Sequence, residues 1–91
     1  MTKYLIEVSH AADPAACNTA IEIFLTSGSH FMTNADWGCK DGVHKAWMIV
    51  DVDSKSEAQE ILPPAFRSQS KITSIIKFEL DNMGEIRPFH E

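Results

Sequence analysis

Hydrophobic and polar residues alternate along two stretches of the chain, and a period of two residues is typical of half-buried β-strands. Within residues 4–10 and 44–52, apolar residues recur at alternate positions and form the sets Tyr4, Ile6 and Val8, and Ala46, Met48, Val50 and Val52. Residues 29–37 and 71–80 are two further extended runs, the last with Ile72, Ile76, Phe78 and Leu80 on one side. The pattern therefore predicts four strands.

Two segments between these strands have helical periodicity and recognisable ends. Asp13-Pro14 is a typical helix start, and the apolar residues that follow at helical spacing are Cys17, Ala20, Ile21, Phe24 and Leu25. Gly28 is a typical residue to end this helix. Ser54 and Glu57 form a capping box for a second, short helix, which Pro63-Pro64 stops.

The order of elements, β-α-β-β-α-β, predicts an α+β domain of the ferredoxin-like kind, with a four-stranded antiparallel sheet and two helices on one face. Residues 29–52 form a hairpin around the turn 38–42. From right-handed crossovers we expect strands 4–10 and 44–52 to lie parallel at the centre of the sheet. Residues 1–91 form one domain in this prediction, and 81–91 form a C-terminal tail without clear periodicity.

The sheet face turned away from the helices has a mixed composition. It is predicted to hold the apolar residues Leu5, Trp47, Ile49 and Ile75 beside the charged residues Glu7, Asp51 and Lys77. Such a face is too apolar to leave bare and too charged for a dry core. It favours a homodimer whose two sheets pack face to face around a partly polar cavity; the alternative is a half-solvated sheet of a monomer.

Composition narrows the possible partners. The net charge is −5, and the eight Lys and Arg residues are scattered, which argues against nucleic-acid binding and against an anionic membrane surface. No apolar run approaches the roughly 20 residues that span a bilayer, and no signal peptide precedes the first strand. We therefore expect a cytoplasmic protein with reduced thiols at Cys17 and Cys39, which form no C-x-x-C pair.

The element order and the face composition of residues 3–80 resemble those of the dimeric α/β-barrel superfamily, which includes muconolactone-isomerase-like and antibiotic-biosynthesis-monooxygenase-like proteins. Residues 35–47, Ala-Asp-Trp-Gly-Cys-Lys-Asp-Gly-Val-His-Lys-Ala-Trp, also resemble a segment of small uncharacterised bacterial proteins of this fold. The resemblance implies a small-molecule-binding dimer, for example an isomerase or an oxygenase. It assigns no catalytic residue, because these differ between the families of the superfamily.

The densest group of reactive side chains surrounds the turn of the predicted hairpin. Asp36, Cys39 and His44 are competent ligands for zinc or nickel, and a tight hairpin would bring Cys39 and His44 together. The predicted topology places His10 and His30 at one edge of the sheet and Cys39 and His44 at the other, so that only His90 could join His44. The sequence requires no cofactor, and a metal is one interpretation of this group.

A second group of candidates lies on the mixed face. A dimer that encloses Glu7 would raise the pKa of its carboxyl group and make it a candidate general base, whereas Lys77 offers a salt bridge instead. Trp47 could stack on a planar ligand. The candidate ligand-binding residues are Glu7, Trp37, Trp47 and His44, for a small planar or acidic metabolite. No motif specifies a reaction, and a non-catalytic protein-interaction module is a further interpretation.

Overall fold

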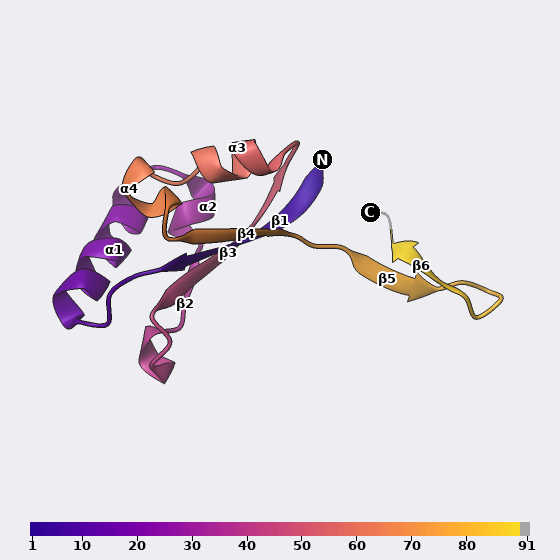
Figure 1. Cartoon of the computed structure of the whole chain (residues 1–91), viewed down its shortest axis with the longest axis horizontal. Helices are drawn as coiled ribbons and strands as arrows, with labels where there is room; N and C mark the ends of the chain where they lie inside the picture. The colour runs from indigo at the N-terminus through magenta and orange to yellow at the C-terminus, as the bar shows by residue number, and fades with distance from the viewer. Residues whose placement is uncertain (90–91) are drawn as a thin grey trace.

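The computed structural model describes residues 1–89, and its body is a four-stranded sheet with helices packed on one face (Figure 1). The strands are β1 (Thr2–Ser9), β2 (Asp36–Trp37), β3 (Lys45–Val52) and β4 (Ser70–Ser74), in the spatial order β2-β3-β1-β4. All three neighbouring pairs are antiparallel, which confirms the predicted antiparallel sheet.

The prediction that the two central strands run parallel is wrong. β1 and β3 pair antiparallel over eight residues, from Thr2 opposite Val52 to Ser9 opposite Lys45. The first crossover connects β1 to β2, and β2 lies beyond β3 in the sheet. The parallel relation that a crossover imposes therefore holds between β1 and β2, which are not neighbours. As a result, the end of β1 meets the beginning of β3.

The helices begin at the residues that the caps predict. The Asp13 side chain accepts a hydrogen bond from the Ala16 backbone N–H at 2.9 Å, and Ser54 accepts one from Glu57 at 3.1 Å. The helical segments are α1 (Pro14–Thr26), α2 (His30–Thr33), the 3₁₀ turn η1 (Cys39–Asp41), α3 (Lys55–Glu60) and α4 (Pro64–Arg67).

Residues 29–37 do not form the predicted strand. The Ser29 side chain accepts a hydrogen bond from the Met32 backbone N–H at 3.4 Å and so caps the short helix α2, whose Met32 side chain is buried. Only Asp36 and Trp37 remain extended and pair with β3. The local hydrogen bonds of serine override the extended pattern of this segment.

The core lies between the sheet and the helices. Its largest fully buried side chains are Phe24, Ile6, Met32, Leu62, Val8 and Val50. The Phe24 ring is central, because its centroid lies 4.9 Å from that of Trp37 and 5.6 Å from that of Phe66. Trp37 is half-buried on this side of the sheet.

The C-terminal part of the chain forms a projecting arm (Figure 1). β5 (Lys77–Leu80) and β6 (Ile86–Phe89) pair as a separate two-stranded hairpin, so the predicted tail at 81–91 is wrong for residues 81–89. The Asp81 carboxylate closes the loop by accepting hydrogen bonds from the backbone N–H groups of Met83 and Glu85, and Gly84 has a positive φ of 78°.

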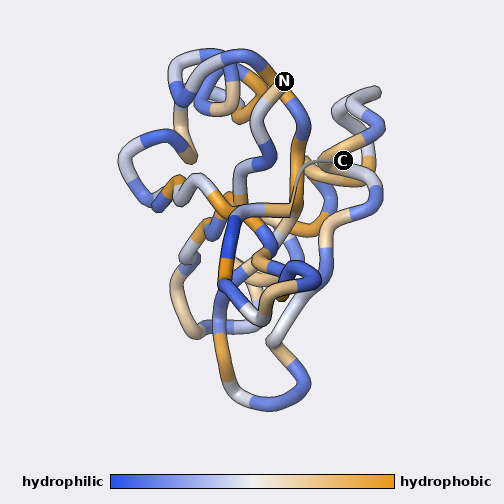
Figure 2. The backbone as a smooth tube through the Cα atoms, turned by 90° about the vertical axis from the view of Figure 1, so that its right-hand side faces the viewer, coloured by the Kyte–Doolittle hydropathy of each residue, from blue (hydrophilic) through white to orange (hydrophobic). Residues whose placement is uncertain are grey.

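The arm makes the molecule longer than its chain length requires. The radius of gyration is 15.6 Å, against about 12 Å for a compact chain of this size. The predicted strand 71–80 is broken after Ser74, and Ile76 and Phe78 are 59% and 64% exposed rather than packed under the helices. Figure 2 faces the side from which the arm projects, where hydrophobic and hydrophilic positions alternate along the chain.

Candidate metal centre

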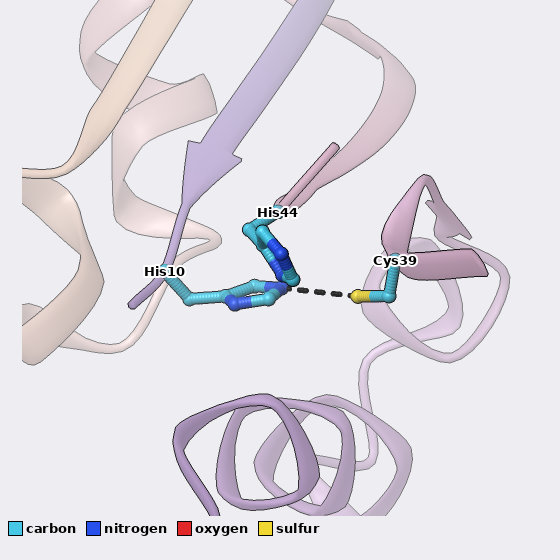
Figure 3. Close-up of side chains that lie close together, drawn as sticks. All are labelled: His10, Cys39 and His44. Atoms are coloured by element: carbon cyan, nitrogen blue, oxygen red, sulfur yellow. Dashed lines mark hydrogen bonds between the residues drawn. The ribbon is translucent and has the colours of Figure 1, made fainter. Parts of the chain in front are cut away.

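Three side chains with metal-binding donor atoms converge at one end of the sheet, on the side that the helices cover (Figure 3). They belong to His10, Cys39 and His44, and one ligand atom from each lies within 4.8 Å of the other two. His10 Nε2 is 3.3 Å from Cys39 Sγ, and the centroids of the two imidazole rings are 5.6 Å apart. All three residues are half-buried.

The two histidines meet because β1 and β3 are antiparallel. His10 directly follows β1, His44 directly precedes β3, and the His10 backbone N–H donates to the His44 carbonyl at 3.1 Å. Side chains alternate across a strand, so these histidines extend the buried rows that contain Val8 and Ala46. The register of the sheet therefore turns both rings toward the helix layer.

Cys39 is positioned by a tight loop that needs a glycine at residue 38. The Gly38 carbonyl accepts hydrogen bonds from the backbone N–H groups of Asp41 and Val43, both at 3.0 Å. A Cβ atom on Gly38 would lie 2.8 Å from two ring carbons of Trp47 and 2.8 Å from the Val43 carbonyl oxygen. Because glycine lets the loop approach the Trp47 ring, Cys39 is carried to the end of the sheet.

Hydrogen bonds orient the donor atoms toward one another. His10 Nδ1 lies 3.0 Å from the Ala11 carbonyl oxygen. A carbonyl oxygen only accepts, so Nδ1 carries the proton, and the lone pair of Nε2 faces Cys39 Sγ. In the described part of the chain, His44 Nδ1 is buried without a hydrogen-bond partner. Such a nitrogen needs an explanation, and a bound ion is one.

Cys17 touches this group from α1. Its thiol donates to Cys39 Sγ, with the two sulfur atoms 3.0 Å apart, and both cysteines are free. The hydrogen bond to Cys39, desolvation and the charge of Cys39, in that order, raise the pKa of the Cys17 thiol. Among residues 1–89, Cys17 is not a member of the three-atom group, so it is a neighbour of the cluster.

The structure separates the metal ligands suggested by the sequence. Cys39 and His44 come together, but Asp36 is exposed and lies opposite Trp47 on the helix-free face. His30 is exposed on α2, where its Nδ1 lies 3.3 Å from the Asn34 amide. His90 lies outside the described residues. The placement of His10 and His44 at opposite edges is wrong, because it depended on parallel central strands.

The candidate ligand-binding residues are also divided between two places. On the helix-free face, Trp47 Nε1 donates to Glu7 Oε1 at 3.2 Å. Lys71, and not Lys77, lies opposite Glu7 in the sheet, because residue 77 already belongs to the arm. Trp37 lies on the helix side, with its ring centroid 5.8 Å from that of His10, and His44 belongs to the cluster.

Sequence reasoning missed two members of this region. It assigned His10 to the wrong edge and treated Cys17 only as a core residue of the helix. A usable signal was present: His10 is in phase with Tyr4, Ile6 and Val8, and His44 is in phase with Ala46 and Met48. Two histidines that continue core rows at a shared strand end indicate a site at that end.

Comparisons with protein-family models, with curated proteins and with solved structures find no match to this chain. Within residues 1–89, no helix has the length and the apolar character that crossing a membrane requires.

Proposed function

We propose that the protein binds a late first-row transition-metal ion, with Zn²⁺ as the reference ion, through His10, Cys39 and His44. The observation that carries this proposal is the convergence of three donors, from the end of β1 and from the loop between β2 and β3, within 4.8 Å. The buried, unpartnered Nδ1 atom of His44 supports it, because an ion would satisfy a nitrogen that the described protein atoms leave without a bond.

The donor set suits such an ion. One thiolate and two imidazoles are ligands that zinc, nickel and copper prefer, whereas magnesium and calcium prefer oxygen. At about 2.1 Å for Zn–N and 2.3 Å for Zn–S, a tetrahedral ion holds its nitrogen and sulfur ligands about 3.6 Å apart. The observed separation of His10 Nε2 and Cys39 Sγ, 3.3 Å, requires only a small adjustment.

The hydrogen bond that holds the His10 ring and the number of protein ligands also support a metal site. The bond from His10 Nδ1 to the Ala11 carbonyl fixes the tautomer that presents Nε2, as the outer hydrogen bonds of metal-binding histidines do. Three protein ligands leave a fourth position for water or for an exchangeable ligand. This arrangement fits a metal-handling or metal-dependent role better than a closed structural site.

A titration of the reduced protein tests the proposal. We expect one Zn²⁺ per chain, and we expect His10→Ala to weaken binding by at least about 100-fold, because removal of a ligand exceeds the effect of removing an outer-shell partner. His30→Ala is the matched control, since His30 is exposed and outside the cluster, and it leaves the affinity unchanged. Equal affinities for the two variants, or binding of Mg²⁺ as tight as that of Zn²⁺, would contradict the proposal.

A second candidate function uses the helix-free face. We infer a ferredoxin-like arrangement from the four antiparallel strands with helices on one face. Two such domains with their open faces together would make a dimeric α/β barrel that binds a small planar or acidic molecule. This proposal is supported by Ile49, which is 55% exposed, and by an open hollow of about 510 Å³ beside it. The hollow is lined by Ile49, Asp51, Ile75 and Phe89, among others, and the Glu7–Trp47 pair lies on the same sheet face.

The arm supports the choice of a second copy of the chain as the partner of this face. One side of the hairpin carries Phe78, Leu80 and Ile86, which are 64%, 69% and 73% exposed. A two-stranded hairpin is marginally stable in water unless its apolar side is covered. The apolar side of the arm and the open sheet face could cover each other between two copies.

Sedimentation equilibrium checks this second candidate. We expect the chain to be a dimer and Ile86→Lys to shift it to monomer, because the substitution places a charge on the apolar side of the arm. Asn82→Lys, in the exposed loop of the same hairpin, adds the same charge and leaves the dimer intact. A monomeric wild-type chain at high concentration would refute the dimeric barrel without affecting the metal site.

A further inference from the structure

The contact between Cys17 and Cys39 joins two segments that are distant in sequence. Cys17 lies in the first turns of α1 and Cys39 begins η1, yet their sulfur atoms are 3.0 Å apart and unbonded. A disulfide requires the sulfur atoms to approach to about 2.05 Å, so a shift of about 1 Å would join them. The pair is thus placed for reversible oxidation.

The two cysteines have different neighbours. Cys39 Sγ faces the Nε2 lone pair of His10 at 3.3 Å, and His10 is held by the Ala11 carbonyl. The Cys39 thiol, the His10 base and the Ala11 carbonyl that orients this base thus form a chain of contacts in space, as in enzymes with a reactive cysteine. Cys17 touches Cys39 from the other side and donates its S–H to it. Cys39 is therefore the attacking thiol, and Cys17 is the resolving thiol.

We propose that Cys39 reduces hydroperoxides and that Cys17 then closes a disulfide with it. In the first step, His10 Nε2 takes the Cys39 proton, and the sulfur attacks one peroxide oxygen. The S–O bond forms and the O–O bond breaks. The alkoxide, or hydroxide if the substrate is hydrogen peroxide, leaves and takes that proton from His10. The product is a sulfenic acid on Cys39.

In the second step, Cys17 Sγ attacks the sulfenic sulfur of Cys39. The S–S bond forms, the S–O bond breaks, and the hydroxide leaves as water with the Cys17 proton. Two thiols lose two electrons and two protons, and the hydroperoxide is reduced to an alcohol and water. A dithiol reductant restores the pair.

This chemistry also regulates the metal centre, a consequence that rests on the proposed function. A metal ion binds the thiolate form of cysteine, and a disulfide sulfur is no longer a thiolate. Oxidation therefore removes Cys39 from the ligand set and leaves only His10 and His44. We expect the protein to release its metal ion when the pair is oxidised and to bind it again after reduction.

The experiment uses the reduced, metal-free protein, so that it does not depend on metal binding. After treatment with hydrogen peroxide, we expect the intact mass to fall by two hydrogen atoms and peptide mapping to find a Cys17–Cys39 cross-link. In Cys17→Ser, and equally in Cys17→Ala, Cys39 stops at the sulfenic acid, which dimedone traps. His10→Gln slows the reaction by about 100-fold, the effect of losing a general base, whereas His30→Gln leaves the rate unchanged.

Several results would overturn the proposal: only intermolecular disulfides, equal trapping of sulfenic acid at Cys17 and Cys39, or stepwise addition of oxygen to wild-type Cys39 without a cross-link. An unaltered rate in His10→Gln would refute the role of His10 as base. A separate measurement on the zinc-loaded protein, with a chromogenic chelator, reports metal release. A cross-link without zinc binding would refute the metal proposal and leave the thiol pair in place.

Discussion

Replacement of Cys39 by alanine is expected to lower the Zn²⁺ affinity by at least about 100-fold. Cys39 is the single cysteine of the three-residue group, and its Sγ lies 3.3 Å from His10 Nε2. Its removal leaves two imidazoles as the remaining members of the group that residues 1–89 form. Two neutral ligands bind zinc weakly, because a thiolate supplies both charge and a soft donor atom. Competition with a chelator of known affinity measures the change.

Lys40→Ala is the matched control for this substitution. Lys40 is adjacent in the same 3₁₀ turn and is exposed, so its loss tests whether any change to the loop weakens binding. We expect the control to keep the affinity of the wild-type protein. If Cys39→Ala binds zinc as tightly as Lys40→Ala does, the metal lies elsewhere in the chain.

Phe24→Ala is expected to lower the free energy of unfolding by about 3–5 kcal/mol, the usual cost of truncating a buried phenylalanine. The Phe24 side chain is fully buried and packs edge-on against the rings of Trp37 and Phe66. Urea unfolding followed by circular dichroism measures the loss. Leu25→Ala is the control on the same helix, since Leu25 is 55% exposed and its loss is expected to cost less than about 1 kcal/mol.

The same substitution connects the core to the metal centre. Trp37 packs between Phe24 and the His10 ring, at centroid distances of 4.9 and 5.8 Å. Zinc at 100 times its dissociation constant would raise the free energy of unfolding by about 2.7 kcal/mol in any variant that keeps the site, because the ion binds only the folded chain. If Phe24→Ala unfolds at the same urea concentration as Leu25→Ala, the core is not centred on this ring.

The strands and helices outside the arm were predictable where the helix caps and the alternation of apolar residues agree with the packing. β1 and β3 follow the alternation of apolar residues, and α1 and α3 begin where Asp13 and Ser54 cap them. Residues 29–37 were mispredicted because their apolar content suits a strand as well as a helix, and the Ser29 cap stabilises the short helix α2. The arm was missed because Pro88 and the charges hide its alternation, although Asp81 and Gly84 are turn residues.

The cluster was only half predictable, because its composition depends on strand direction rather than on sequence spacing. Cys39 and His44 are five residues apart, and a tight loop brings them together in any arrangement of the sheet. His10 joins them only if β1 and β3 are antiparallel, since a parallel pair would place it at the far end of β3. Cys17 is added by the packing of α1 over that same end.

The two sides of the sheet carry two different proposed roles. The helix-covered side ends in the cluster of His10, Cys39 and His44, with Cys17 beside it, and this side carries the proposed metal and thiol chemistry. The open side carries Glu7, Trp47 and Ile49 and is the proposed surface for a second copy and a small molecule. Substitution of Ile49 should leave the metal centre intact, because additivity holds for separated sites, whereas Trp47 packs against Gly38 and so contacts the loop that positions Cys39.

X-ray absorption spectroscopy of the reduced, zinc-loaded wild-type protein tests the metal centre most directly, because it identifies the atoms bound to the ion. We expect one sulfur ligand at about 2.3 Å together with imidazole nitrogen ligands at about 2.0–2.1 Å. The sulfur contribution should disappear in Cys39→Ala and persist in Cys17→Ala. A spectrum of the wild-type protein that contains only oxygen and nitrogen ligands would contradict a metal centre built on His10, Cys39 and His44.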